Sequence, residues 1–168
     1  MKVTLRKFKL KDVNSLAENT NEKLIAKNLI GIILPYTKKD SLSWIKEVKK
    51  EYLKSKPNKL YFGIIVNGIA VGEVGLYDID HENKHAELVY WIGKNYRGKG
   101  IVKKAVKQML DYGFKKLKLV RIFATIFVYN KQSIDLLKSL KFKYEGKQRK
   151  VTFKDGKYLD EYTYALIK

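Results

Sequence analysis

The chain has 168 residues, 45% of them hydrophobic, and two prolines, which predicts one folded domain over residues 1–168 and excludes a largely disordered chain. It has no cysteine, which excludes disulfides and a cysteine nucleophile; the two histidines, His81 and His85, are expected on the surface, so no metal site is expected. The net charge of +19 comes mostly from dispersed lysines, so contact with nucleic acid is expected to be secondary. No apolar run approaches the roughly 18 residues that span a membrane, and "MKVTLRKF" lacks a signal-peptide core, which predicts a soluble, cytoplasmic protein.

The first half of the chain predicts a strand, helices and then three strands. Alternating residues in "VTLRKF" are typical of a half-buried strand, and a short helix is expected over residues 12–18. A second helix is expected to begin at Asp40 or Ser41 as N-cap and to end by Pro57; its apolar stripe is made of Leu42, Ile45, Val48 and Tyr52. Asn67 and Gly68 signal a hairpin between "LYFGIIV" and "IAVGEVGLYDID", and "HAELVYWI" is the next strand. Connections this short join antiparallel neighbours.

The second half of the chain begins with the polar loop "GKNYRGKG". A stripe of apolar residues with helical spacing then runs from Val102 to Leu117. "LVRIFATIFV" follows as a strand, a helix begins near Asn130, and Asp155 and Gly156 form a second hairpin turn before the last strand, "EYTYALI". This order of elements predicts an α/β (α+β) fold with a largely antiparallel sheet.

The loop has two partial motif matches. Gly93, Gly98 and Lys99 nearly complete a P-loop, but Gly100 replaces the hydroxyl residue that would hold Mg²⁺, and the short strand connections also argue against that fold. Gly98 and Gly100 begin a dinucleotide fingerprint, but Lys103 occupies its third glycine position. The strand-loop-helix order still places free backbone N–H groups at a helix N-terminus, which predicts a phosphate site. The alternative is a tight turn with a solvated Lys99.

The segment "YRGKGI" resembles motif A of the GNAT superfamily of N-acetyltransferases, with Arg97 and Gly100 in place. The segments "AELVYW", "NKQSIDLLKSLKF" and "DGKYLDEYTYALI" extend this likeness over nearly the whole chain, and together they resemble the RimJ/RimL-like branch. Two positions depart from the pattern. Val102 replaces the final Gly or Ala of the motif, and Lys141 replaces a common Gly before Phe142.

The resemblance implies a GNAT-like mixed, largely antiparallel sheet flanked by helices on both faces. It also implies that acetyl-CoA is wedged between the strands ending at Ile92 and Val128, with its pyrophosphate held by backbone N–H groups and without a metal. Asn130 is expected to contact the pantetheine arm. The expected cofactor-binding residues are Trp91, Ile92, Arg97, Gly98, Lys99, Gly100, Ile101, Val102, Lys103 and Asn130.

Acetyl transfer needs a neutral amine, so a base matters more than an acid, because a lysine-like amine has a pKa near 10.4 and the leaving thiol one of about 8.5. Glu87 is the expected base. It shares a strand face with Val89 and Trp91, apolar surroundings that raise a carboxylate pKa, and GNAT enzymes often place a carboxylate there. The alternative is a structural carboxylate paired with a lysine, and Glu73 is the reserve base. Ser133 is expected near the sulfur, with helix capping as its alternative role.

The resemblance also implies the class of acceptor, a primary amine. A protein N-terminal α-amino group of the ribosomal-protein type is expected. The alternatives are a small-molecule amine, such as an amino-sugar nucleotide or a polyamine, and a non-enzymatic RNA- or ribosome-binding protein on the same scaffold. The charge of +19 would oppose the approach of spermidine and attract an acidic protein, provided that the excess charge extends to the cleft. A homodimer is compatible with each of these functions.

Overall fold

A seven-stranded sheet forms the centre of the computed structural model, which describes residues 2–168. The strands lie in the order β1-β2-β3-β4-β5-β7-β6, and every neighbouring pair is antiparallel except β4 and β5. The predicted largely antiparallel sheet is therefore confirmed. The bounds of the strands are β1 (Val3–Arg6), β2 (Leu60–Val66), β3 (Ile69–Asp80), β4 (His85–Ile92), β5 (Arg121–Phe127), β6 (Lys143–Lys154) and β7 (Lys157–Ile167).

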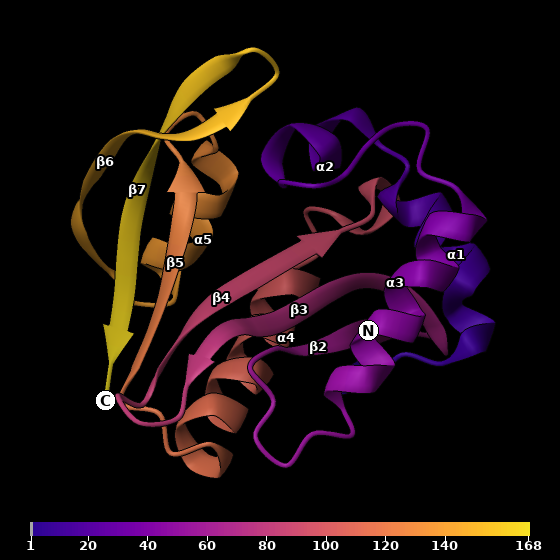
Figure 1. Ribbon diagram of the computed structural model, residues 1–168, viewed down its shortest axis with the longest axis horizontal. Coiled ribbons are helices and arrows are strands. Elements are labelled where there is room, and N and C mark those ends of the chain that lie inside the picture. Colours follow the sequence, from indigo (N-terminus) through magenta and orange to yellow (C-terminus); the bar gives the residue numbers. More distant parts are fainter. Residues whose placement is uncertain (1) are drawn as a thin grey trace.

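Helices cover both faces of the sheet, as predicted (Figure 1). On one face, Leu16 of α1 and Ile45 of α3 belong to a buried cluster with Tyr61 of β2. On the other face, Met109 of α4 belongs to the larger core with Leu76 of β3. None of the helices in residues 2–168 has the length and apolarity needed to cross a bilayer. The helices are α1 (Val13–Thr20), α2 (Lys23–Asn28), α3 (Lys38–Glu51), α4 (Ile101–Asp111) and α5 (Lys131–Ser139), with the 3-10 turns η1 (Leu10–Asp12) and η2 (Lys94–Tyr96) and a π-helical turn, η3 (Tyr112–Lys116), that continues α4.

Helix α3 begins earlier than the sequence predicted, so the expected N-cap at Asp40 or Ser41 is wrong. Thr37 is the N-cap: its Oγ1 accepts a hydrogen bond from the Asp40 N–H at 3.3 Å, and Asp40 Oδ2 accepts one from the Thr37 N–H at 2.8 Å. These two bonds form a capping box, in which a Thr and an acidic residue three positions later satisfy each other's backbone donors. Asp40 therefore lies in the first turn of α3.

Strands β4 and β5 run parallel but pair over only three residues, from His85 to Glu87 on β4. Glu87 faces Phe123 in the last pair, and from Leu88 onward β4 has no partner strand on this side within residues 2–168. Figure 1 shows the two strands separating in the direction of α2. The opening that the sequence predicted between these strands is therefore present, and we call it the fork.

Lys141, the position where the sequence pattern commonly has Gly, lies in the turn after α5. The Phe142 N–H donates to the Leu137 carbonyl at 3.1 Å and the Lys141 N–H to the Lys138 carbonyl at 2.9 Å, which is the bond pattern of a Schellman motif. This motif requires a left-handed residue, usually glycine, and Lys141 has φ of 68°. The turn is therefore the one that glycine favours, formed here by an exposed lysine.

Candidate active site

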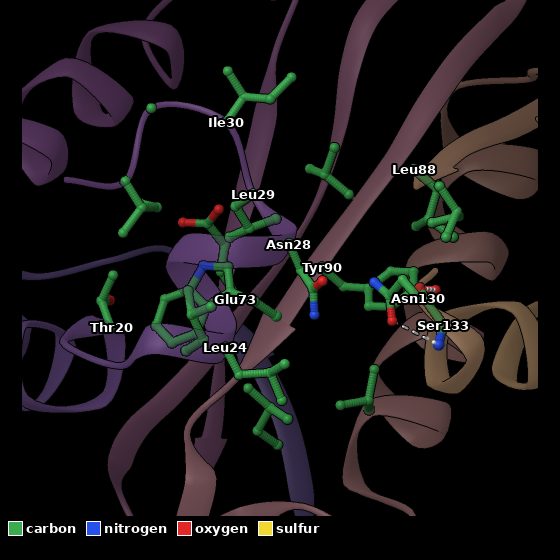
Figure 2. Close-up of a pocket in the computed structure, with 18 of the residues that line it drawn as sticks. Thr20, Leu24, Asn28, Leu29, Ile30, Glu73, Leu88, Tyr90, Asn130 and Ser133 are labelled. Atoms are coloured by element: carbon green, nitrogen blue, oxygen red, sulfur yellow. Dashed lines mark hydrogen bonds between the residues drawn. The ribbon is translucent and has the colours of Figure 1, made fainter. Parts of the chain in front are cut away.

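A cleft of about 1480 Å³ opens at the fork and reaches α2. Figure 2 shows Thr20 and Glu73 at one side of this cleft and Asn130 and Ser133 at the other, with Tyr90 between them. Most ligand pockets have volumes of about 300–1000 Å³, so this cleft has room for more than one substrate.

The loop before α4 presents backbone N–H groups to open space. Gly98 has φ of 70° and Gly100, the N-cap of α4, has φ of 68°, and a Cβ built on either residue would meet no atom within 4 Å. The first N–H groups of α4 have no acceptor within the helix, and they lie at its positive end. The loop therefore fits an anion such as a phosphate, and its two glycines lie where left-handed backbone is required.

The charged side chains of this loop form hydrogen bonds with other groups of the same chain. The Arg97 guanidinium makes a bidentate pair with the carboxylate of Glu22, with Nη1 to Oε1 at 2.7 Å, and Nη2 also donates to the Ile92 carbonyl at 3.3 Å. Lys99 Nζ donates to the Asn95 carbonyl at 2.8 Å. Arg97 therefore links the loop to the start of α2, and we infer that the loop would hold a phosphate chiefly by its backbone.

Of the expected cofactor contacts, all except Lys99 line the cleft. Val102, half-buried, packs against the main core as well as lining the cleft, so this branched side chain is accommodated where the family motif has Gly or Ala. Ile101 is buried at the start of α4. The other lining residues from the expected set are Trp91, Ile92 and Lys103.

Tyr90 and Ser133 form a hydrogen-bonded pair across the fork. The Tyr90 hydroxyl lies 2.5 Å from Ser133 Oγ, and Asn130 Oδ1 accepts a hydrogen bond from the Ser133 N–H at 3.3 Å as the N-cap of α5. Burial raises the pKa of Tyr90 to about 12, so this phenol keeps its proton at neutral pH. Asn130 therefore does cap α5, whereas the Ser133 hydroxyl has a separate partner that the sequence did not single out among twelve tyrosines.

Glu87 lies at the closed end of the fork. Its Oε1 accepts hydrogen bonds from the Thr125 hydroxyl and from the Thr125 N–H, the latter at 3.2 Å. Burial raises the pKa of Glu87, in the direction expected for a base. The ion pairs formed within residues 2–168 do not include Glu87, which argues against the alternative of a carboxylate paired with a lysine.

Two further carboxylates are buried beside the cleft. Glu73 is 6% exposed, its Oε2 accepts a hydrogen bond from Trp44 Nε1 at 2.8 Å, and burial raises its pKa to about 7. Glu161, on β7, is 7% exposed and accepts a hydrogen bond from the Thr152 hydroxyl at 2.6 Å. The sequence placed Glu73 in reserve and gave no sign of Glu161, whose position depends on the pairing of β7 with β5.

The cleft is acidic although the chain is strongly basic. Three cationic side chains line it, Lys59, Arg97 and Lys103, and Arg97 is already paired with Glu22. Six acidic residues line it: Asp40, Glu47, Glu73, Glu87, Asp135 and Glu161. The excess positive charge of the chain does not extend to the cleft, so the electrostatic argument against polycationic acceptors is wrong at this site. Within residues 2–168, no group of three or more acidic or histidine side chains is arranged to hold a metal ion.

Residues 2–143 match the family model of the acetyltransferase (GNAT) domain. The chain belongs to this family. It is 35% identical over 173 aligned residues to the uncharacterized N-acetyltransferase p20 of Bacillus licheniformis, an alignment that covers 99% of this chain and 93% of p20. These matches make this GNAT protein an N-acetyltransferase that uses acetyl-CoA, the donor that the resemblance implied.

Other relatives support the expected branch of the GNAT family. The "Putative ribosomal N-acetyltransferase YdaF" of Bacillus subtilis is 29% identical, over 99% of this chain and 91% of YdaF. The structure of the microcin C7 self-immunity acetyltransferase MccE, solved with acetyl-CoA and AMP, has a TM-score of 0.88 at 28% identity and covers 99% of this chain and 93% of MccE. RimL, at a TM-score of 0.90 and 18% identity over 99% of this chain and 94% of RimL, shares the fold. The likeness to the RimJ/RimL branch is confirmed.

We expect Glu73 to make the protein less stable as the pH rises from about 4.5 to about 7. In this range the native state keeps the Glu73 proton while the unfolded chain loses it, because the native pKa is raised from 4.5 to about 7. The unfolded state then binds fewer protons, so the free energy of unfolding falls with rising pH, by up to roughly 3 kcal/mol. Urea unfolding gives the free energy of unfolding of wild type and of Glu73→Gln at each pH in this range. We expect this free energy to fall with rising pH in wild type but less in the variant, so that the variant is relatively more stable at pH 7. The same pH dependence in both proteins would show that the pKa of Glu73 is not raised.

Proposed function

We propose that this N-acetyltransferase moves an acetyl group from acetyl-CoA to the N-terminal α-amino group of a protein. The observation that carries the proposal is the fork, with the loop before α4 at its open end and the buried carboxylate of Glu87 at its closed end. The ribosomal class of acceptor is supported by the likeness to YdaF over nearly the whole chain. The volume of the cleft, about 1480 Å³, supports a site for two substrates together.

In this proposal the cofactor is held mainly by backbone groups. The N–H groups of residues 97–103 bind the pyrophosphate at the start of α4, and the free edge of β4 beyond Leu88 pairs with the amides of the pantetheine arm as an added strand would. Trp91 and Ile92 supply part of that edge, and the Asn130 side chain contacts the same arm. Acetyl-CoA supplies a reactive thioester, and the activation of the amine is left to the protein.

Side chains on opposite faces of β4 then act on different parts of the reaction: Glu87 on the amine, and Tyr90 with Ser133 on the leaving sulfur. Glu87, whose pKa is raised by burial, accepts the proton of the incoming amine, an α-amino group with a pKa near 8. The Tyr90 and Ser133 hydroxyls keep their protons at neutral pH, and in our proposal Ser133 donates a hydrogen bond toward the sulfur as the thiolate leaves. Tyr90 orients the Ser133 hydroxyl.

A second candidate acceptor is a small polyamine, and the acidic lining of the cleft favours it. Carboxylates outnumber cationic side chains there, so a polycation is attracted once it passes the basic exterior. A purely RNA-binding function is disfavoured by the family membership and by the presence of Glu87, Tyr90 and Ser133 at the cleft.

The acceptor is tested by measuring release of free CoA thiol with an acidic N-terminal peptide, a UDP-amino-sugar and spermidine. We expect the peptide to give the highest kcat/KM, because its α-amino group has a pKa near 8 and is neutral more often at neutral pH than the amines of spermidine. The measurement is made at low and high salt. Spermidine as the best substrate would replace the protein acceptor with the polyamine.

The base is tested by Glu87→Gln. The amide oxygen of glutamine can still accept the Thr125 hydrogen bonds, so the fork keeps its shape while the proton acceptor is lost. We expect kcat to fall by about 10²-fold or more, with affinity for acetyl-CoA within about twofold of wild type. Ser133→Ala should lower kcat less. A fully active Glu87→Gln enzyme at neutral pH would assign the proton transfer to another group.

A further inference from the structure

Glu73 is a buried carboxylate without a cation. The chain has 36 lysines and arginines against 17 acidic residues, yet the ion pairs within residues 2–168 do not include Glu73. Its hydrogen-bond donors are the neutral indoles of Trp44 and Trp91. A buried carboxylate normally has a cationic partner, because the loss of its hydration is otherwise uncompensated. In so basic a protein, the missing cation indicates that the partner arrives from outside.

The surroundings of Glu73 suit an organic cation. In the ladder between β3 and β4, Glu73 faces Trp91, and both residues line the cleft. Trp44, which lines it as well, packs edge-on against Tyr61 with ring centroids 5.0 Å apart. Aromatic faces beside a carboxylate are a common setting for ammonium groups, because the ring quadrupole attracts a cation.

Thr20 is a second polar group without a partner at the same side of the cleft (Figure 2). Thr20 is 1% exposed, and its Oγ1 has no hydrogen-bond partner among the described residues. A buried hydroxyl in this state lowers stability unless a ligand supplies a partner. It comes from the end of α1, whereas Glu73 comes from the sheet, so this side of the cleft carries both a hydroxyl without a hydrogen-bond partner and a carboxylate without a cation.

We propose that Glu73 is the counter-ion of the acceptor's ammonium group, in a subsite completed by Thr20, Trp44 and Trp91. This inference rests on the proposed function, since it assumes an amine acceptor, and it names the group that pairs with the ammonium of that acceptor as it enters the cleft. The subsite recognises a primary ammonium, whose three N–H donors match a carboxylate and a hydroxyl. It requires no second charge on the acceptor.

The inference is tested by Glu73→Gln, which is isosteric and keeps an acceptor for Trp44. We measure kcat and KM for an alanine-initiated acidic peptide and for spermidine. We expect the KM of each amine that is acetylated to rise at least tenfold, because a charge-assisted contact is lost, while the KM of acetyl-CoA stays within about twofold. Glu18→Gln, an exposed change on α1 away from the cleft, is the matched control and should leave all constants unchanged.

The outcomes separate this inference from the proposed function. If spermidine is the preferred substrate but its KM still rises in Glu73→Gln, the protein acceptor fails and the ammonium subsite stands. If Glu73→Gln leaves the KM of every acetylated amine unchanged, the subsite is overturned. If neither amine is acetylated, the subsite is tested by thermal unfolding instead. The unfolding temperature in butylammonium chloride is compared with that in sodium chloride at equal concentration. Stabilisation by butylammonium in wild type and not in Glu73→Gln supports the subsite, and equal or absent effects overturn it.

Discussion

The early end of the β4–β5 ladder is the constraint on which the rest of this structure depends. Backbone N–H and C=O groups inside a protein need partners, so two neighbouring strands separate only where something else satisfies them. At the closed end of the fork that substitute is Glu87, whose carboxylate accepts a hydrogen bond from the Thr125 N–H beyond the last strand pair. Further along, in our proposal, the free edge of β4 pairs with acetyl-CoA. One glutamate therefore closes the sheet and, in our proposal, accepts a proton.

The two faces of the sheet at the cleft have opposite polarity. The start of α4, on one face, presents N–H groups around Gly98 and Gly100, which favours an anion, whereas Glu73 and Glu87 lie on the other face with Trp91 and favour a cation. A phosphorylated acyl donor and an ammonium acceptor would therefore be directed to different faces of the sheet before any specific contact forms. The lysines on the outside do not alter this arrangement, because charge at the surface is screened within about 8 Å at physiological salt.

Local signals in the sequence predicted the parts of the structure that depend on neighbouring residues. Asn67 and Gly68 form the predicted hairpin turn, and α4 and α5 lie where the helical spacing placed them. The predicted N-cap of α3 was wrong because Asp40, a residue type common at N-caps, is here the third residue of the helix. It forms a capping box with the true N-cap, Thr37. Short α2 was not predicted, since six residues carry too little periodicity.

The candidate site could be predicted only where the family motif marks it. The resemblance located the loop and Glu87, but the partner of Ser133 lies 43 residues away on β4, and no local pattern connects the two. The isolation of Glu73 is a property of what surrounds it in space, and so is the acidity of the cleft. Composition alone indicated the opposite charge, because it sums over the whole chain.

The central claim, that acetyl-CoA binds in the fork as an added strand, is tested most directly by amide hydrogen exchange with and without this ligand. The account predicts slower exchange in residues 88–92 of β4 and in the loop of residues 97–103, with no change along the outer strand β6. Protection confined to other parts of the chain, or protection of the loop by ATP and Mg²⁺ but not by acetyl-CoA, would contradict it.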